Sequence, residues 1–349
     1  MKTIKVAFFD AKPYDRETFD AVNRGDGVEL KYVALHLSPD TVHVAAGADA
    51  LCIFVNDLVT REVAEALHAQ GAKLIALRCA GYNNVDLKAV YQRIHVVRVP
   101  AYSPYAVAEH AAALLLALNR KTHKAYFRTR DGNFSIHGLM GFDLHGKTAG
   151  VVGTGKIGRV MAGLLRGFGM RVLAFDPFPD AVFAQASGCT YADLPTLYRE
   201  SDVLTLHCPL TPENVRMINA ETIAQMKRGV FIINTGRGKL IDTRALIGGL
   251  KSGRVGAAGL DVYEEETDYF FEDFSSAVID DDVLARLLTF PNVLITSHQA
   301  FFTREAMANI AQTTLANIRA FFERGELPHE ICYRCGDATC QRKASGKCF

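Results

Sequence analysis

At residues 151–158 the chain reads Val-Val-Gly-Thr-Gly-Lys-Ile-Gly, with an apolar run, Thr148–Val152, leading into the glycines and a helical pattern, Lys156–Phe168, after them. In such a strand–turn–helix unit the first glycine, Gly153, allows a tight turn, and the second, Gly155, lets a pyrophosphate approach the backbone. The third, Gly158, allows close packing of helix against strand. Exposed amides at the helix start favour an anion. The stretch therefore predicts a dinucleotide-binding α/β unit.

An acidic residue supports this interpretation and bears on the choice of cofactor. Asp176 ends the next apolar run, 18 residues beyond Gly158. That is close to the ~20 residues expected for the carboxylate that accepts hydrogen bonds from the ribose hydroxyls. A carboxylate there repels a 2′-phosphate, and the following Pro177–Pro179 contains no arginine to neutralise one. We therefore expect NAD and not NADP. The alternative is an ordinary strand–turn–helix with a surface aspartate.

Short apolar runs alternate with helical patterns in two series along the chain. This alternation predicts parallel sheets with helices on both faces. A long helix, Tyr105–Thr129, is expected between the series, and an amphipathic helix, Arg304–Phe322, after the second. The strands expected in the first series are Ile4–Phe9, Leu30–Leu35, Leu51–Val55, Leu74–Leu77 and His95–Val99, and those in the second are Thr148–Val152, Arg171–Phe175, Val203–His207, Val230–Asn234, Ala257–Val262 and Val293–Thr296.

We predict an α/β protein with two doubly wound parallel-sheet domains and an active-site cleft between them. The final helix comes after the second sheet is complete, so it can return to the first domain. The expected domains are a flavodoxin-like substrate domain (1–101 plus 300–331), a Rossmann NAD-binding domain (102–299) and a cysteine-rich tail (332–349).

Composition narrows the function classes. The 349 residues are 49% apolar and 22% charged, which is ordinary for a globular protein and too apolar for disorder. Lysine plus arginine (39) nearly cancels aspartate plus glutamate (38), so no field of one sign would attract nucleic acid or an anionic membrane. The longest smooth apolar run, Ala111–Leu118, is far shorter than the ~20 residues of a membrane span. The first residues form a strand pattern and not a signal peptide. We expect a soluble, cytosolic protein.

Three charged or titratable residues follow expected strands of the second series. They are Arg237, Glu266 and His298. Because the carboxyl ends of parallel strands form the ligand crevice, all three are expected at the edge that carries the glycine turn.

These residue types suit hydride transfer between a hydroxyl and a carbonyl. Histidine, with an ordinary pKa of about 6.5, can act as base or acid near neutrality. A neighbouring carboxylate stabilises the imidazolium, so Glu266 would keep His298 charged and oriented. Arg237 can bind a substrate carboxylate and polarise the adjacent carbonyl. Taken singly, the arginine could be a surface ion pair, the glutamate a solvated acid and the histidine a loop hydrogen-bonder. As a set beside a nucleotide turn they indicate an enzyme.

At these residues the chain resembles the D-isomer-specific 2-hydroxyacid dehydrogenase family, and within it the D-lactate dehydrogenase branch. The resemblance covers about residues 1–331. The matching stretches are Arg78–Asp86, Val99–Pro104, Gly153–Gly158, His207–Asn214, Asn234–Gly238, Asp261–Glu266, Pro291–Leu294 and His298–Phe301.

The resemblance implies a role for each motif. It implies that Arg237 binds the substrate carboxylate, that His298 is the proton donor and that Glu266 is its partner. It implies substrate contacts at Arg78, Ala80, Gly81, Tyr102 and Phe301, and closure of the two domains over the substrate. It also implies homodimers or homotetramers formed through the Ala111–Leu118 region. The NAD contacts that it implies are Gly153, Gly155, Lys156, Ile157, Gly158, Asp176, Cys208, Pro209, Asn214, Thr235, Gly236 and Asp261.

The branch and the substrate rest on fewer residues. The segment Asp268–Phe274 resembles the aromatic–acidic insertion of D-lactate dehydrogenases, and Tyr102 and Phe301 would suit a small 2-oxo or 2-hydroxy acid such as pyruvate. These aromatics could instead fill a hinge or a domain interface. Relatives that act on hydroxyisocaproate or phenyllactate share most of the motifs. The C-terminal-binding-protein corepressors, which sense NAD(H), keep the same arginine, glutamate and histidine.

Eight cysteines are unevenly placed. Four lie singly in apolar contexts, where a buried thiol is expected: Cys52, Cys79, Cys189 and Cys208. The other four lie in the last 18 residues, beyond the family pattern: Cys332, Cys335, Cys340 and Cys348. Their number suits a tetrahedral zinc or iron site. Redox pairing of Cys332 with Cys335, or a flexible tail, would also account for them. No metal is included among the predicted site groups.

Overall fold

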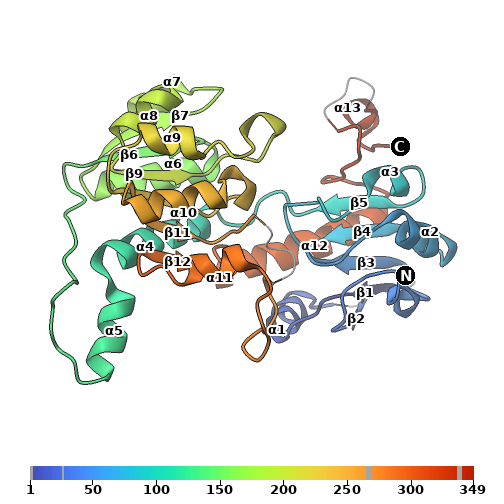
Figure 1. Ribbon diagram of the computed structural model, residues 1–349. Coiled ribbons are helices and arrows are strands. Elements are labelled where there is room, and N and C mark those ends of the chain that lie inside the picture. The colour runs from blue at the N-terminus through green and yellow to red at the C-terminus, as the bar shows by residue number, and fades with distance from the viewer. Residues whose placement is uncertain (1–2, 26, 265–268, 336–339) are drawn as a thin grey trace. The chain divides into compact units, whose positions relative to one another are not determined.

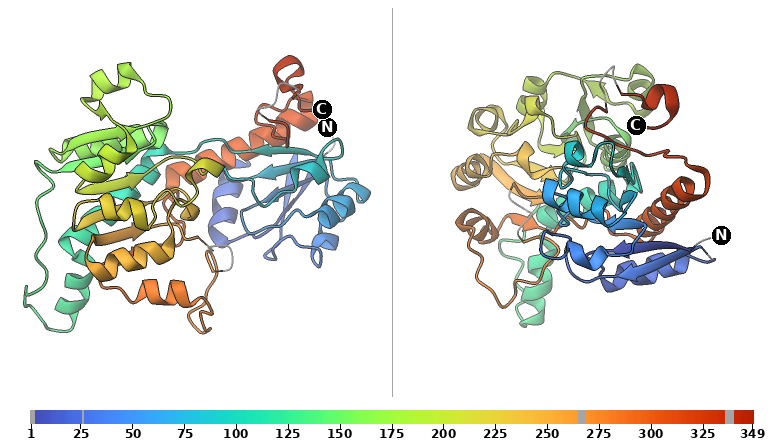
Figure 2. Two further views of the ribbon diagram at one scale, coloured as in Figure 1. Left: turned by 45° about the horizontal axis from the view of Figure 1, so that its top comes forward. Right: turned by 90° about the vertical axis from the view of Figure 1, so that its right-hand side faces the viewer.

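The computed structural model describes residues 3–25, 27–264, 269–335 and 340–349. The chain forms two compact units, Met1–Ser103 with Phe302–Phe349, and Pro104–Phe301. These bounds lie within two residues of the expected domain boundaries, and the tail joins the first unit. In Figure 1 and in both views of Figure 2 the C-terminal segment (red) accordingly lies with the N-terminal strands (blue). Within the described residues, no helix has the length and apolar character to cross a membrane.

The first unit is built on a five-stranded parallel sheet in the order β2-β1-β3-β4-β5. β3 and β4 are short apolar runs that are buried at every position, as strands covered on both faces must be. α12 packs against α1 and against β4 and β5 of this sheet. The strands are β1 (Ile4–Phe8), β2 (Val28–Tyr32), β3 (Ala50–Ile53), β4 (Leu74–Leu77) and β5 (His95–Arg98), and the helices are α1 (Pro13–Val22), α2 (Arg61–Ala69), α3 (Leu87–Val90), α12 (Arg304–Arg324) and α13 (Arg342–Ser345).

The second unit is built on a seven-stranded parallel sheet in the order β12-β11-β10-β9-β6-β7-β8. Its strands are β6 (Thr148–Val152), β7 (Arg171–Phe175), β8 (Thr190–Tyr191), β9 (Val203–Leu206), β10 (Val230–Asn234), β11 (Val255–Leu260) and β12 (Val293–Ile295). Its helices are α4 (Pro104–Arg120), α5 (Thr122–Arg130), α6 (Lys156–Gly167), α7 (Ala181–Ser187), α8 (Leu194–Glu200), α9 (Ala220–Gln225), α10 (Thr243–Ser252) and α11 (Asp282–Leu288).

Both faces of this sheet are buried. Ile233 of β10 belongs to an apolar cluster with residues of α4 and α6, whereas its neighbour Ile232 belongs to a second cluster with residues of α8, α9 and α10. Successive strand residues point to opposite faces, so consecutive isoleucines serve both cores. Strand order reverses at β6, whose neighbours are β9 and β7. Such a switch point opens a crevice at the carboxyl ends of the strands.

The α/β class with two parallel sheets is confirmed. Several details differ from the predictions, and the strand expected at Ala257–Val262, for example, is Val255–Leu260. The helix expected over Tyr105–Thr129 is two helices, because Lys121 adopts a left-handed conformation (φ 51°) that ends α4. The strand expected at Leu30–Leu35 lies two residues earlier, at Val28–Tyr32, where it pairs with β1 in register. The two-residue strand β8 was not predicted, because it is too short to carry a pattern.

Candidate functional site

The three glycines of the nucleotide turn have the geometry that their spacing predicts. Gly153 has φ of 92°, and a Cβ there would come within 2.8 Å of the His207–Cys208 backbone, which follows the neighbouring strand β9. A Cβ on Gly158 would lie 1.9 Å from the carbonyl oxygen of Gly153, so this turn admits no side chain at position 158. Around Gly155, by contrast, no described atom lies within 4 Å of an added Cβ. The turn leaves room for a ligand at Gly155.

Asp176 completes the first part of this site at the end of β7. Its Oδ2 accepts hydrogen bonds from the backbone N–H of Thr154 (2.7 Å) and from the Thr154 hydroxyl (3.1 Å), and its Oδ1 accepts from the N–H of Phe178 (2.9 Å). Burial acts to raise the pKa of Asp176, but the hydrogen bonds outweigh it and hold the pKa below its usual range. The carboxylate is therefore ionised at neutral pH, as a repeller of a 2′-phosphate must be.

The loops after β9 and β10 lie at the same carboxyl-end edge of the sheet. Cys208 lies beside the glycine turn, and Asn214 donates from its amide to the carbonyl of Pro209 (2.7 Å). Within the described residues the hydroxyl oxygen of Thr235 is buried with no hydrogen-bond partner. A buried hydroxyl without a partner is costly, and a bound polar ligand would supply one. Together with the space at Gly155, this orphaned hydroxyl fits a dinucleotide along the edge of the sheet.

Arg237 is positioned by a tightly folded loop. The side-chain amide of Asn234, the last residue of β10, donates to the carbonyl of Arg237 (2.9 Å), and its oxygen accepts from the N–H of Gly236 (3.0 Å). A Cβ on Gly238 would lie 1.9 Å from the carbonyl oxygen of Tyr263. This close approach joins the Arg237 loop to the segment after β11 that leads toward residue 266. The guanidinium of Arg237 is half-buried and donates to the carbonyl of Gly236 (2.7 Å).

His298 lies in a turn organised by Asp261. The backbone N–H of His298 donates to the carbonyl of Asp261 (2.8 Å), and the Asp261 carboxylate accepts from the N–H groups of Gln299 (2.9 Å) and Ala300 (2.8 Å). The Asp261 side chain is fully buried. The structure thus shows Asp261 positioning the His298 turn. Its implied contact with NAD stays a prediction.

Two residues that were not identified from the sequence support this turn through hydrogen bonds that lead to Asp261. The Thr296 hydroxyl donates to Asp261 Oδ1 (2.5 Å), so its oxygen is left to accept from His110 Nε2 (3.0 Å) on α4. His110 and Thr296 are 186 positions apart. No local pattern in the sequence connects them.

The partner expected for His298 lies outside the described residues. Glu266 belongs to 265–268, so its prediction is neither supported nor opposed by the geometry. Of the expected insertion, residues 269–274 are described. Phe270 is buried in an apolar cluster with Tyr263 and Leu284, and the ring of Phe271 lies 6.0 Å from the imidazole of His298, centroid to centroid.

In the first unit, Arg78 lies deeper than a substrate ligand is expected to lie. Its guanidinium is buried, donates to the carbonyls of Phe9 (3.1 Å) and Asp10 (2.8 Å), and pairs with Asp15 (3.4 Å). The ring of Phe8 packs against it at 4.5 Å. Arg78 therefore joins the end of β1 to α1. Its contact with the substrate stays a prediction.

The other substrate residues occupy loops. Ala80 and Gly81 follow β4, and Arg98 of β5 donates to the carbonyl of Ala80 (2.7 Å). Among the described residues neither the Ala80 nor the Gly81 N–H has a hydrogen-bond acceptor, so both remain able to bind a carboxylate. The carbonyl of Tyr102 accepts from Asn309 of α12 (2.9 Å). Phe301 is half-buried at the end of the second unit.

Comparisons with known proteins agree with this geometry. Residues 112–300 match the model of the D-isomer specific 2-hydroxyacid dehydrogenase, NAD binding domain. The chain is 54% identical to the D-lactate dehydrogenase of Escherichia coli K12 over 330 residues, which cover 94% of this chain and 100% of that protein.

Solved structures give the same result. The apo-structure of D-lactate dehydrogenase from Escherichia coli has a TM-score of 0.86 at 52% identity and covers 94% of this chain and 99% of that one. A structure of D-2-hydroxyisocaproate dehydrogenase has a TM-score of 0.83 at 33% identity, with the same coverage. The chain therefore belongs to the D-isomer specific 2-hydroxyacid dehydrogenase family and is an NAD-dependent oxidoreductase.

Proposed function

We propose that this oxidoreductase is a D-lactate dehydrogenase that reduces pyruvate to D-lactate with NADH. One observation carries the proposal: Arg237 and His298 follow β10 and β12, the strands on either side of β11, at the sheet edge that also bears the Gly153 turn. A cation for a carboxylate and a titratable imidazole thus share one edge with the nucleotide site. The 54% sequence identity to a D-lactate dehydrogenase supports the choice of substrate.

Each residue has a separate task in the proposed reaction. Arg237 binds the carboxylate of the 2-oxo acid, which orients the carbonyl carbon. NADH, when bound along the Gly153 turn, supplies the hydride. His298 donates a proton to the carbonyl oxygen as that oxygen becomes a hydroxyl, and takes it back in the oxidation direction. Glu266 is proposed to stabilise the imidazolium.

The size of the substrate is the finer part of the proposal. The ring of Phe271 lies beside His298, so an aromatic group stands close to the proposed proton donor. Such a wall favours a methyl group over a branched or aromatic side chain. Acids such as 2-oxoisocaproate and phenylpyruvate are the alternative substrates, because a structural relative of this chain is a D-2-hydroxyisocaproate dehydrogenase.

The test is steady-state NADH oxidation with pyruvate, 2-oxoisocaproate and phenylpyruvate, followed by chiral analysis of the product. We expect the highest kcat/KM with pyruvate, and D-lactate as the product. A higher kcat/KM with either larger acid would replace lactate by that acid's product, and L-lactate would overturn the stereochemistry. If none of the three acids supported NADH oxidation, the proposed enzyme activity would be refuted, and a protein that only binds NAD(H) would be the remaining interpretation.

We also propose that the chain forms a homodimer or homotetramer, through a surface different from the Ala111–Leu118 region that the family resemblance implies. The Ala111–Leu118 region is largely buried inside the second unit, against α6 and the sheet, so it offers little surface to another copy. The segment after it is different: none of the residues of α5 is buried, and large apolar side chains around it are exposed. They are Tyr126, Phe127, Phe134, Ile136 and Met140. A second copy of the chain is the occupant that we propose for this surface. The cytosolic location stays a prediction.

A further inference from the structure

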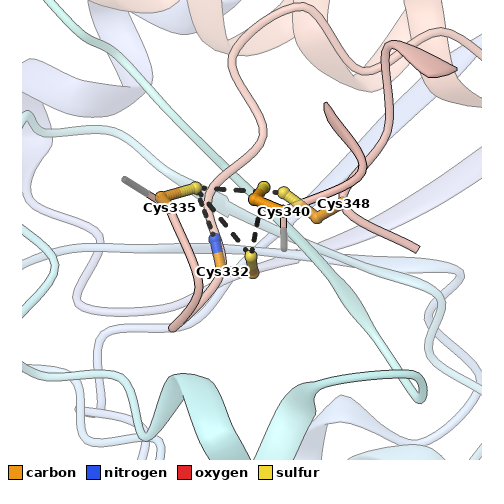
Figure 3. A group of neighbouring side chains, drawn as sticks. All are labelled: Cys332, Cys335, Cys340 and Cys348. Carbon is orange, nitrogen blue, oxygen red and sulfur yellow. Dashed lines mark hydrogen bonds between the residues drawn. The ribbon is translucent and has the colours of Figure 1, made fainter. Parts of the chain in front are cut away.

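The four cysteines of the tail converge, although they are spread over 17 residues of sequence. Cys335 Sγ lies 3.9 Å from Cys332 Sγ and 3.9 Å from Cys348 Sγ, and Cys332 Sγ lies 4.0 Å from Cys340 Sγ (Figure 3). All four sulfurs lie within 4.8 Å of one another. Figure 3 shows their side chains directed toward a common centre.

These separations are those of ligands around one metal ion. A tetrahedral zinc with Zn–S bonds of about 2.3 Å places its sulfurs about 3.8 Å apart. A disulfide needs about 2.05 Å, and all four cysteines are free. The sulfurs are too close together to ligate a multi-iron cluster, whose cysteines stand around several metal atoms. The arrangement therefore matches a single ion.

The backbone around the cluster is shaped for thiolates. The N–H of Cys332 donates to Cys335 Sγ (3.2 Å), and the N–H of Cys335 donates to the carbonyl of Cys332 (3.1 Å), which closes a tight turn. Cys332 and Cys348 are only 5% and 1% exposed, whereas Cys335 is open to solvent. Two ligands are thus fixed in the interior and one gives an ion a path of entry.

Contacts with the first unit hold the tail in this shape. The buried carboxylate of Glu330 binds His95 Nδ1 (2.5 Å) and accepts from the backbone N–H of Cys348. The ring of the last residue, Phe349, stacks on His95 with centroids 4.3 Å apart. Arg342 donates to the carbonyl of Glu330 (2.5 Å). The described residues at the end of the chain therefore contact the first unit, which favours a docked segment over the flexible tail that was one of the three interpretations.

A cross-link would add stability to so short a segment, beyond what its contacts with the first unit provide. Eighteen residues bury too little apolar surface to offset their conformational entropy. A bound cation would displace the thiol protons, because only thiolates ligate the ion. Four soft sulfur ligands in tetrahedral array are the donor set of structural zinc.

We propose that Cys332, Cys335, Cys340 and Cys348 bind one structural zinc ion. The ion staples the C-terminal segment beside β5, the edge strand of the first unit, where Glu330 forms an antiparallel bridge with Val97. Binding displaces the thiol protons as thiolates ligate the ion, with no change of oxidation state. The site lies in a different unit from the Gly153 turn, so it does not depend on the proposed dehydrogenase reaction.

The first test is the metal content of the full chain, purified without a metal-affinity step or chelator. We expect one zinc per chain by plasma mass spectrometry. Chelated protein refilled with Co²⁺ should develop the strong visible absorption of tetrahedral cobalt thiolate. Iron at that stoichiometry, no stoichiometric metal, or disulfides among the four cysteines by mass mapping would each overturn the proposal.

The second test uses matched variants. Cys332→Ser and Cys348→Ser should each lose the zinc, while Cys189→Ser, which removes a buried thiol in the other unit, and Ser345→Ala, which changes the tail without removing a ligand, should keep it. Hydrogen exchange of residues 340–349 should rise at least tenfold in the zinc-free variants, and NADH should still bind. Full zinc content in either tail cysteine variant would contradict the assignment.

Discussion

His298 owes its position to its backbone as much as to its side chain. It adopts φ of 53°, a left-handed conformation that costs a non-glycine residue about 1–3 kcal/mol and persists only where the surroundings enforce it. The enforcing group is Asp261, whose carbonyl and carboxylate accept from three consecutive residues, 298–300. Strain that is held in this way at a titratable residue is typical of a functional position.

His298→Ala should lower kcat by about 10³-fold or more with pyruvate, because the carbonyl oxygen loses its proton donor. NADH affinity should remain within about threefold, since the nucleotide turn is untouched. His43→Ala, an exposed histidine of the first unit, serves as the control and should keep full activity. Turnover near the wild-type value in His298→Ala would remove this residue from the mechanism.

Asp176→Asn should relax the selectivity for NADH. The ionised carboxylate repels a 2′-phosphate, and the amide does not, while it can still accept from the N–H of Thr154. We expect the ratio of kcat/KM for NADPH to that for NADH to rise by about tenfold or more. An unchanged ratio, or a wild-type enzyme that prefers NADPH, would show that Asp176 does not choose the cofactor.

His207 should make stability depend on pH. Burial lowers its pKa to about 4, and its Nε2 contacts the Thr205 hydroxyl at 2.8 Å. The unfolded chain, with a histidine pKa of about 6.5, binds the proton more readily below that value. The contribution of His207 to the free energy of unfolding is thus fully present above about pH 6.5. It is lost as the pH drops toward 4, which lowers the free energy of unfolding by up to about 3 kcal/mol.

Urea unfolding of wild type and His207→Gln at about pH 5 and pH 7.5 measures this contribution. The loss of unfolding free energy between the two pH values should be smaller in the variant. An equal loss in both proteins would mean that other groups cause the acid sensitivity.

At the scale of the elements, two glycines of α6, Gly158 and Gly163, allow the effect of close packing to be distinguished from the effect of helix propensity. Gly158 faces the carbonyl of Gly153, whereas an added Cβ at Gly163 meets no described atom within 4 Å. Gly158→Ala should therefore push the helix from the turn and weaken NADH binding by about tenfold or more. Gly163→Ala should bind NADH normally and gain about 0.5–1 kcal/mol of stability.

Isothermal titration with NADH and thermal unfolding read out both variants. Equal NADH affinity in Gly158→Ala and wild type would mean that the turn does not carry the dinucleotide. A loss of affinity in Gly163→Ala would mean that α6 tolerates no change at all, and the comparison would then say nothing special about position 158.

At the scale of the whole molecule, the exposure of α5 indicates that it contacts another copy of the chain. A nine-residue helix with no buried side chain is too short to be stable alone in water, and its apolar side chains form an unusual surface for a monomer. Ile136 and Met140 in the following segment are 84% and 86% exposed. Burial of this surface against a second copy would stabilise both.

Sedimentation velocity should accordingly show a dimer or tetramer for wild type, and a shift toward monomer for the double variant Ile136→Asp, Met140→Asp, because charges there would be buried without partners. Val278→Asp, which places a charge on a similarly exposed apolar residue elsewhere in the second unit, should leave the assembly unchanged. A monomeric wild type would refute the interface.

Much of the local geometry of the glycine turn could be predicted, because it depends on neighbours in the chain. The roles of Gly153 and Gly158 follow from their spacing between a strand and a helix, and Asp176 follows from the length of one strand–helix–strand unit. The break at Lys121 could not be predicted, since its left-handed conformation interrupts an otherwise continuous helical pattern. Nor could the depth of Arg78, whose partners Phe9, Asp10 and Asp15 come from the loop after β1 and from α1, more than 60 positions away.

The sequence by itself determined the α/β class, the place of the dinucleotide turn and the order in which Arg237 and His298 follow their strands, because local spacing and apolar periodicity specify strands, turns and helix starts. Only the tertiary structure decided that Asp261, Thr296 and His110 form one network behind His298, and that four tail sulfurs converge at metal-binding distances. The physical reason is the same in both cases. Contacts between residues far apart in the chain form when separate elements pack, and no pattern within a single segment encodes which side chains then meet.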